Sequence, residues 1–391
     1  MICPHCDTSL LHRERTNRRC GRCARRFALE PKENGLRLHD NRAHRLVERL
    51  GDGGRVRYTP AQFWYAAGRG RLPAPGEGFV GCAVVLVVVL CGAVAGARAV
   101  FDLHGTRIAP VIGSALALFL LLLLLRWRSS RRASRLAAIR MPMELTALET
   151  ELAEHWVAAY GAPPPGMVTG ELPAGAWRGA GPPVAAVLCP DPSVLTCLAA
   201  NGLPQRLAVR LHTAPEQIPD GLPTVVLHDA SPSGVLFAAE ARRVLGPRAV
   251  VAGLAPRTVL PAPGPPDQAG GPAAWRGPAP EEDTGPGRGL RLREAPPAAE
   301  EIARLREAER RLTEAEVAWL AAGWWFPLAA VRPAVLLEVV EAGVRRARER
   351  VDPDRHAARA VGFLTRPAGG GAAGPPDGPG PSADRPGQER R

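Results

Sequence analysis

Four cysteines near the N-terminus have the type and spacing needed to bind one metal ion. They form two C-x2-C pairs separated by residues 7–19: Cys3, Cys6, Cys20 and Cys23. Each pair fits a tight turn, and two such turns supply four thiolates in a tetrahedron, as in structural Zn²⁺ sites. Because cysteine fills all four positions, no coordination site is open to a substrate, and the zinc is predicted to be structural. His5 and His12 are therefore expected to be bystanders.

Through these cysteines, the first 30 residues resemble a zinc ribbon. Disulfides are disfavoured in a reducing cytoplasm, and a thioredoxin-type redox pair would need a βαβ setting. The segment also contains seven arginines: Arg13, Arg15, Arg18, Arg19, Arg22, Arg25 and Arg26. Their charge suits nucleic-acid phosphates, anionic lipid head groups or an unknown protein partner. Phe27 is the one aromatic residue here for base stacking, so nucleic acid is the less favoured partner.

Two carboxylates follow apolar runs in the middle of the chain. The stretch TVVLHDASPSG, residues 224–234, ends such a run with Asp229, and Asp191 follows an earlier run at 183–189. Apolar runs alternate with helical stretches between residues 183 and 260, which predicts a parallel sheet covered by helices. Acidic side chains at the carboxyl ends of parallel strands are well placed to hold a metal or a substrate.

Residues 183–260 resemble the Toprim domain of the type IIB DNA topoisomerase A subunit. The resemblance rests on D-A-S-P-S-G (229–234), G-L-A-P-R-T-V (253–259) and PDPSVLTCL (190–198). It implies a Mg²⁺ site formed by a glutamate after the first strand and by two aspartates of a D-x-D turn. Here Ser231 replaces the second aspartate, which leaves Asp229 and Asp191 as candidate Mg²⁺ ligands. Mg²⁺ prefers more anionic oxygens than this pair offers with certainty, so we predict a Toprim-like scaffold without Mg²⁺ or catalysis. Asp229 is then expected to cap the following helix or to bond the turn backbone.

Other reactive side chains of this domain are predicted to be structural. Cys189 and Cys197 are expected in the core, and strand alternation allows His228 and Asp229 to lie on opposite faces. The chain has a single lysine, Lys32, so a Walker-type G-K-[ST] loop and a kinase-type strand lysine are excluded.

Two uncharged runs, 79–97 and 108–125, predict a transmembrane hairpin over residues 79–127. Arginines flank the pair, so the positive-inside rule places both termini in the cytoplasm of a bacterial-type inner (plasma) membrane. The arginines of residues 126–140 would contact anionic lipid head groups. Gly92 and Gly96 form a G-x-x-x-G pair that suits packing within the hairpin or a homodimer.

The remaining segments complete a multi-domain organisation. Residues 36–78 are predicted to be a short helical region, and 141–162 an amphipathic helix. A disordered Pro/Gly linker is expected at 261–298, a helical region at 299–362 and a disordered tail at 363–391. Within the helical region, 317–331 is predicted to form a packed helix–turn–helix, with an interfacial segment as the alternative.

The predicted fold class is a multi-domain membrane protein with a zinc ribbon, a transmembrane hairpin and a cytosolic Toprim-like α/β domain with a helical extension. The favoured function is a non-enzymatic, membrane-anchored interaction or regulatory protein. One alternative is a metal-dependent phosphoryl-transfer or nucleic-acid-processing enzyme at Asp229. The other is a membrane-tethered nucleic-acid binder led by the ribbon.

Overall fold

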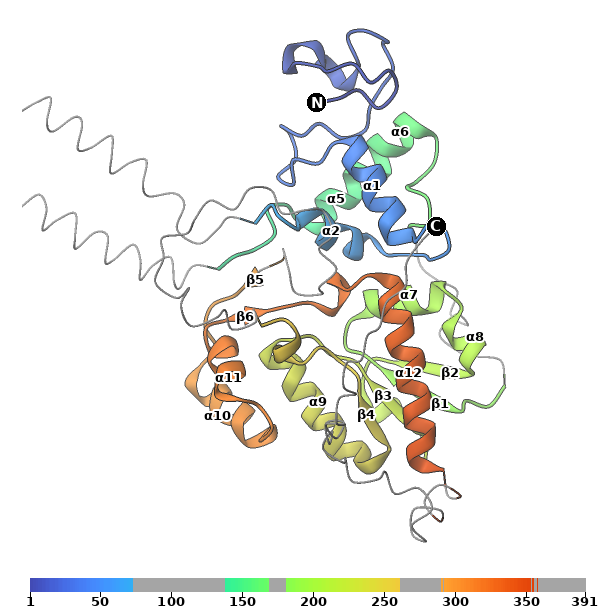
Figure 1. Cartoon of the computed structure of the whole chain (residues 1–391), viewed down its shortest axis with the longest axis vertical. Helices are drawn as coiled ribbons and strands as arrows, with labels where there is room; N and C mark the ends of the chain where they lie inside the picture. Colours follow the sequence, from blue (N-terminus) through green and yellow to red (C-terminus); the bar gives the residue numbers. More distant parts are fainter. Residues whose placement is uncertain are drawn as a thin grey trace, which may run out of the picture.

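The computed structural model describes residues 1–72, 138–168, 181–260, 290, 292–352, 354 and 357. Two bodies are seen in Figure 1: an N-terminal module above and an α/β domain below.

The N-terminal module is assembled from two distant stretches of the chain. The ribbon, with short 3₁₀ turns at His12–Glu14 and Thr16–Arg18, leads into α1 (Asp40–Gly51) and α2 (Pro60–Gly68). Residues 145–160 then return as one helical rod made of α5 (Leu145–Glu151), a π turn (Leu152–Trp156) and α6 (Val157–Tyr160). The rod buries Leu148, Leu152 and Trp156 against Tyr58 and Phe63. The amphipathic helix predicted at 141–162 therefore belongs to the same core as residues 28–67.

A four-stranded parallel sheet forms the centre of the second body. Its strands are β1 (Ala185–Leu188), β2 (Val209–His212), β3 (Thr224–Val226) and β4 (Ala249–Val251), in the order β2-β1-β3-β4. The register places Val187 opposite both Leu211 and Val225. The parallel sheet expected from the alternation of apolar runs and helical stretches is confirmed.

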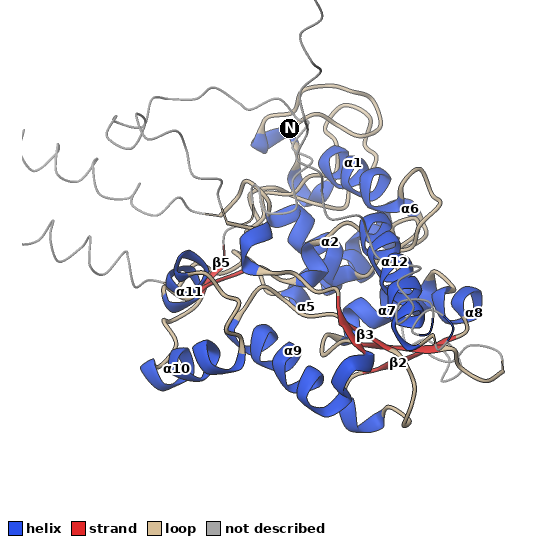
Figure 2. Ribbon diagram, turned by 60° about the horizontal axis from the view of Figure 1, so that its bottom comes forward, coloured by secondary structure: helices blue, strands red, loops and turns tan. Residues whose placement is uncertain are grey.

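Helices cover both faces of this sheet (Figure 2). The helix α9 (Pro232–Leu245) packs on the face that carries Ala186, Leu188 and Val226. The opposite face packs against α7 (Pro192–Ala200) and α12 (Pro333–Val351), while α8 (Leu203–Leu207) precedes β2. At Gly343 of α12 an added Cβ would lie 2.9 Å from Val225 Cγ1, so glycine lets this helix approach the sheet closely. The predicted helical extension is thus partly wrong, because α12 is one layer of the α/β domain itself.

A hairpin and two helices complete the domain. Strands β5 (Leu292–Arg293) and β6 (Trp324–Trp325) pair antiparallel, with α10 (Ala299–Ala308) and α11 (Glu314–Ala321) between them. The predicted linker is wrong at its end, since residues 292–298 are structured, while 261–289 lie outside the described residues. The predicted helix–turn–helix at 317–331 is also wrong, because α11 leads into β6 and then a 3₁₀ turn, Leu328–Ala330.

The prediction of a two-span membrane protein is contradicted. No helix within the described ranges is long and apolar enough to cross a membrane. Of the described helices α12 has the length, with 19 residues, but arginines and glutamates crowd its C-terminal half. The expected spans at 79–97 and 108–125, the Gly92/Gly96 pair and all the arginines of 126–140 except Arg140 lie outside the described residues. The transmembrane fold class and the two-span inner-membrane location are withdrawn accordingly.

Candidate functional site

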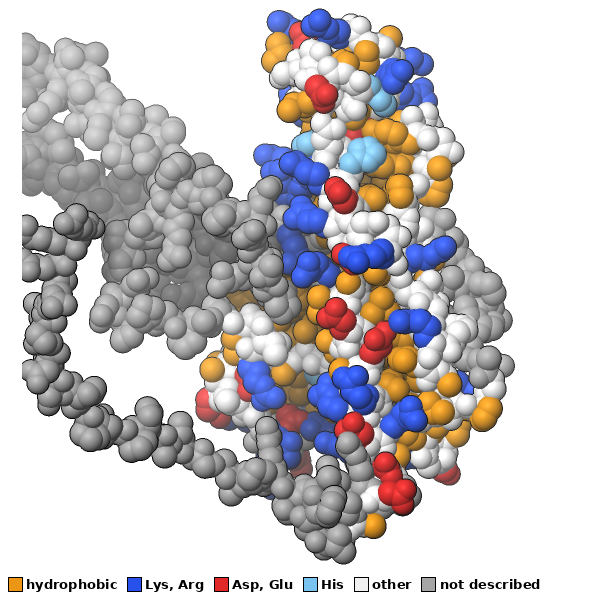
Figure 3. All heavy atoms as spheres, turned by 45° about the vertical axis from the view of Figure 1, so that its right-hand side comes forward, with side chains coloured by type: hydrophobic (Ala, Val, Ile, Leu, Met, Phe, Trp, Pro, Cys, Tyr) orange, Lys and Arg blue, Asp and Glu red, His pale blue; other side chains and the backbone are white. Residues whose placement is uncertain are grey.

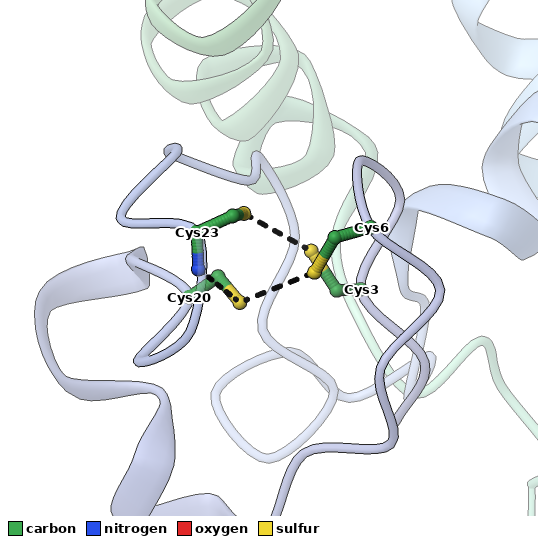
Figure 4. Close-up of side chains that lie close together, drawn as sticks. All are labelled: Cys3, Cys6, Cys20 and Cys23. Carbon is green, nitrogen blue, oxygen red and sulfur yellow. Dashed lines mark hydrogen bonds between the residues drawn. The ribbon is translucent and has the colours of Figure 1, made fainter.

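The four N-terminal cysteines converge on one point (Figure 4). Their sulfur atoms all lie within 4.8 Å of one another, and the Cys3–Cys23 and Cys6–Cys20 sulfurs are each 3.8 Å apart. A tetrahedral Zn²⁺ with bonds of about 2.3 Å places its sulfur ligands about 3.8 Å from one another. The cluster could therefore hold a metal ion, and its dimensions are consistent with zinc.

Two backbone turns of similar design build this cluster. Bridges between Ile2 and Ser9 and between Arg19 and Arg26 close each turn. The residue after the second cysteine of each pair has a positive φ, 55° at Asp7 and 59° at Ala24, and its N–H bonds the carbonyl of the first cysteine. This path also points backbone N–H groups at sulfur, with the Arg22 amide 3.4 Å from Cys20 Sγ. Such donors stabilise a thiolate.

The thiols differ in how readily they ionise. Burial raises the pKa of Cys3 to about 12. The pKa of Cys6 is lowered to about 6, mainly by a hydrogen bond with the Thr8 side chain. Four sulfurs this close cannot all carry negative charge without a cation among them. A divalent ion bound to the thiolates would supply the missing charge.

Neither neighbouring histidine joins the cluster. The Nε2 of His5 is 2.8 Å from the carbonyl oxygen of Arg26, and Nδ1 of His12 is 3.9 Å from the carboxylate of Glu30. Both side chains have other partners, as expected of bystanders.

Two of the seven ribbon arginines are structural. Arg15 is buried and donates two hydrogen bonds of 2.8 and 2.9 Å to the Glu30 carboxylate. Arg18 reaches Glu151, 133 residues later, at 2.8 and 3.0 Å and fastens the ribbon to α5. The other five are exposed: Arg13, Arg19, Arg22, Arg25 and Arg26. Figure 3 shows basic side chains gathered over the ribbon at the top of the molecule.

A buried carboxylate, which the sequence analysis did not single out, holds the ribbon to the helices. Asp40, at the start of α1, accepts hydrogen bonds of 2.8 Å from the backbone amides of Ala28 and Leu29. The hydroxyl of Tyr160 in α6 donates to the same carboxylate. In the sequence, Asp40 is recognisable only as an acidic residue at the start of a helix. Acidic residues are common at that position in exposed helices, so the pattern does not predict a buried carboxylate.

Asp191 and Asp229 lie at the carboxyl ends of the adjacent strands β1 and β3. The chain leaves β1 toward β2 on one side and β3 toward β4 on the other, so this is the point where the strand order reverses. Ligands of open α/β sheets bind in the crevice at such a point. The two residues therefore lie where an open α/β sheet would bind a ligand.

Both carboxylates are used by the fold. Asp191 accepts from the Ser193 amide at 2.8 Å and caps α7, and Asp229 Oδ1 accepts from the Leu328 amide at 2.6 Å. The cap of α9 is Ser231, whose hydroxyl accepts from the Gly234 amide at 3.0 Å. The predicted role of Asp229 as helix cap or turn residue is wrong, because its partner is a backbone amide 99 residues away.

The protein itself partly covers this crevice, and Asp191 and Asp229 are both half-buried. Tyr65 of α2 is affected by both aspartates: burial, and then the charges of Asp229, Asp191 and Glu294, raise the pKa of its hydroxyl. The helix α2 packs on the 3₁₀ turn Leu328–Ala330, and Arg69 donates to the Ala330 carbonyl at 2.8 Å.

This setting raises the pKa of both acids. Burial is the first cause for each; it raises the pKa of Asp229 to about 6, with a further contribution from the charge of Asp191. The Leu328 amide acts in the opposite direction on Asp229. Within the described residues, the four ribbon cysteines form a group of side chains close enough to share a metal ion. The two aspartates are not part of any such group of three or more.

The other reactive side chains lie apart from the aspartates. His228 Nδ1 is 2.8 Å from the carbonyl oxygen of Asp229, and its ring lines a cleft between α9 and α12 rather than the covered crevice. Cys189 and Cys197 are both 0% exposed, as expected of core residues.

Comparison with protein families, with characterised proteins and with solved structures found no match to this chain. The likenesses to a zinc ribbon and to a Toprim domain rest on the residues quoted above.

Proposed function

We propose that this protein is a non-catalytic interaction or regulatory protein, in which a structural zinc ion organises an arginine-rich ribbon that binds an acidic protein partner. The α/β domain serves as a Toprim-like scaffold. The observation that carries this proposal is the use of Asp191 and Asp229 as backbone hydrogen-bond acceptors, the latter for the 3₁₀ turn Leu328–Ala330 on which α2 packs. Carboxylates so engaged and so covered are poor candidates for the metal ligands of a phosphoryl-transfer enzyme.

The ribbon has the surface that an acidic protein would recognise. It exposes five arginines and also two apolar side chains, Ile2 at 50% and Leu11 at 57%. Mixed apolar and arginine contacts are typical of protein interfaces. Phe27 is 0% exposed, so it offers no platform for base stacking, which favours a protein over a single-stranded nucleic acid.

Zinc is expected at one equivalent per chain, because the four sulfurs already have the spacing of a tetrahedral site. Cys20→Ser should lose the ion and unfold the ribbon, since metal binding and folding are coupled in so small a module. His5→Ala is the matched control and should retain zinc, because its side chain contacts the Arg26 carbonyl instead. Metal analysis of protein purified without chelator checks both variants, and a metal-free wild type would contradict the prediction.

Partner binding is tested by crosslinked capture from cell extract with the full chain as bait. Arg22→Gln/Arg25→Gln should lose the captured protein while keeping zinc, because both side chains are exposed beside the second cysteine pair. The control Arg345→Gln/Arg348→Gln removes two exposed arginines of α12 and should capture normally. Capture that disappears on nuclease treatment would point to nucleic acid, and capture that ignores the ribbon variant would also contradict the proposal.

A further inference from the structure

A second site lies at the far end of the molecule from the ribbon. A cleft of about 710 Å³ opens beside the edge strand β4, between α9 and α12, with the start of α11 and the loop before it along its rim. Small-molecule sites fall in the range of about 300–1,000 Å³. Five arginines line the cleft: Arg242, Arg257, Arg311, Arg346 and Arg350. Since they come from separate segments of the chain, the fold brings together charges that the sequence leaves apart.

Three acidic residues also line the cleft, Glu309, Glu316 and Glu349, so its five arginines outnumber its carboxylates. Glu309 pairs with Arg242. Glu316 is 0% exposed, and its carboxylate accepts from the amides of Arg257 at 3.1 Å and of Thr313 at 2.8 Å. It therefore fixes the wall of the cleft through the backbone and leaves the side chain of Arg257 free of it.

Three guanidinium groups remain for a ligand. Arg257, Arg311 and Arg346 are exposed and form no ion pair with a carboxylate of the described residues. The Nε of Arg346 donates to the Ala342 carbonyl at 3.2 Å within its own helix, which orients the side chain. Arg350 is held in place by donating to the Ala249 carbonyl of β4 at 3.1 Å.

A buried imidazole also faces this space. His228 is 5% exposed and lines the cleft, with Nδ1 placed against the Asp229 carbonyl. Gly253 makes room for the ring, because an added Cβ would lie 2.2 Å from His228 Cδ2. An imidazole that lines the cleft is a candidate contact for a bound molecule, because its ring nitrogens can donate or accept a hydrogen bond.

We propose that this cleft binds a small molecule that carries a diphosphate or triphosphate group. Planar guanidinium groups bind phosphate oxygens through paired, charge-assisted hydrogen bonds, and several of them match the charge of linked phosphates. Val235, Ala238 and Val250 give the cleft an apolar wall against which the rest of the ligand can pack. Binding here does not depend on the zinc ribbon, which lies at the opposite end of the molecule (Figure 1).

Calorimetric titration of the full chain with pyrophosphate and with ATP, at roughly physiological salt, tests this site. At least one probe should bind, and Arg346→Gln should weaken that binding by about tenfold or more, the effect expected of a charged hydrogen bond. Arg345→Gln is the matched control: Arg345 is the neighbouring residue of α12, is equally exposed and does not line the cleft. It should change the affinity by less than about twofold.

Melting curves of the two variants should coincide, because both arginines are exposed. A loss of binding could then not be explained by a loss of folding. A wild-type chain that binds neither probe at roughly millimolar concentration would overturn the proposal. An equal loss of binding in Arg345→Gln and Arg346→Gln would do the same, since it would indicate general attraction to a basic surface.

Discussion

At the residue scale, the cysteines could be assigned from sequence and the aspartates only in part. Two C-x2-C pairs define a tetrahedral site by local turns, so their spacing alone predicted the cluster. The partners of Asp229 and Arg18 lie 99 and 133 residues away, and no local pattern encodes such pairs. For the same reason the sequence did not separate the two structural arginines of the ribbon from the five exposed ones.

A pH-dependent stability effect is expected from Asp229. Its pKa rises from an ordinary value of 3.8 to about 6 in the folded protein, chiefly because it is buried. A raised carboxyl pKa means that ionisation opposes folding. The penalty is absent below the unfolded pKa and grows as the pH rises from about 4 to about 6.

Asp229→Asn should therefore stabilise the protein near neutral pH, on the order of 1–3 kcal/mol. The amide oxygen of asparagine can still accept from the Leu328 amide, while the half-buried charge is removed. Urea unfolding of both proteins across this pH range measures the difference, which should shrink toward the acid end. A constant difference, or a destabilised variant at neutral pH, would contradict this account of the carboxylate.

At the element scale, the alternation of apolar runs and helical stretches predicted the parallel sheet, because fully buried strands need helices on both faces. The same alternation could not assign α12 to the sheet, because its sequence pattern is that of any helix with one apolar face. Its position on the sheet depends on Gly343 meeting Val225 across a long stretch of chain. The hairpin of β5 and β6 was missed because strands of two residues carry no periodicity.

Leu336→Ala tests whether α12 is an integral layer of the domain. Leu336 is 1% exposed in the main core, so its truncation should cost about 2–5 kcal/mol of the unfolding free energy. Glu338→Ala, on the exposed side of the same helix, should change it by less than about 0.5 kcal/mol. If α12 were a detachable extension, both variants would leave the main unfolding transition of the full chain in place.

At the scale of the whole molecule, the N-terminal module closes the edge of the sheet where an α/β enzyme would work. The contact is built by α2 with the 3₁₀ turn Leu328–Ala330, and by Arg57, whose amide and carbonyl bond the Asn201 side chain at 2.8 Å each. Single-segment patterns cannot show that one domain covers the crevice of another. The sequence therefore indicated where a metal site would lie, and the structure adds that the chain itself partly covers this place.

The most direct test of the central claim is whether the covered carboxylates bind Mg²⁺. Thermal unfolding of the full chain should be the same with and without roughly millimolar Mg²⁺, because Asp191 and Asp229 are engaged with backbone amides. A ligand present at 100 times its dissociation constant would add about 2.7 kcal/mol to the folded state, which a melting curve detects. A wild-type protein that Mg²⁺ stabilises, and an Asp229→Asn variant that it does not, would contradict the account and assign the two aspartates to a metal-dependent active site.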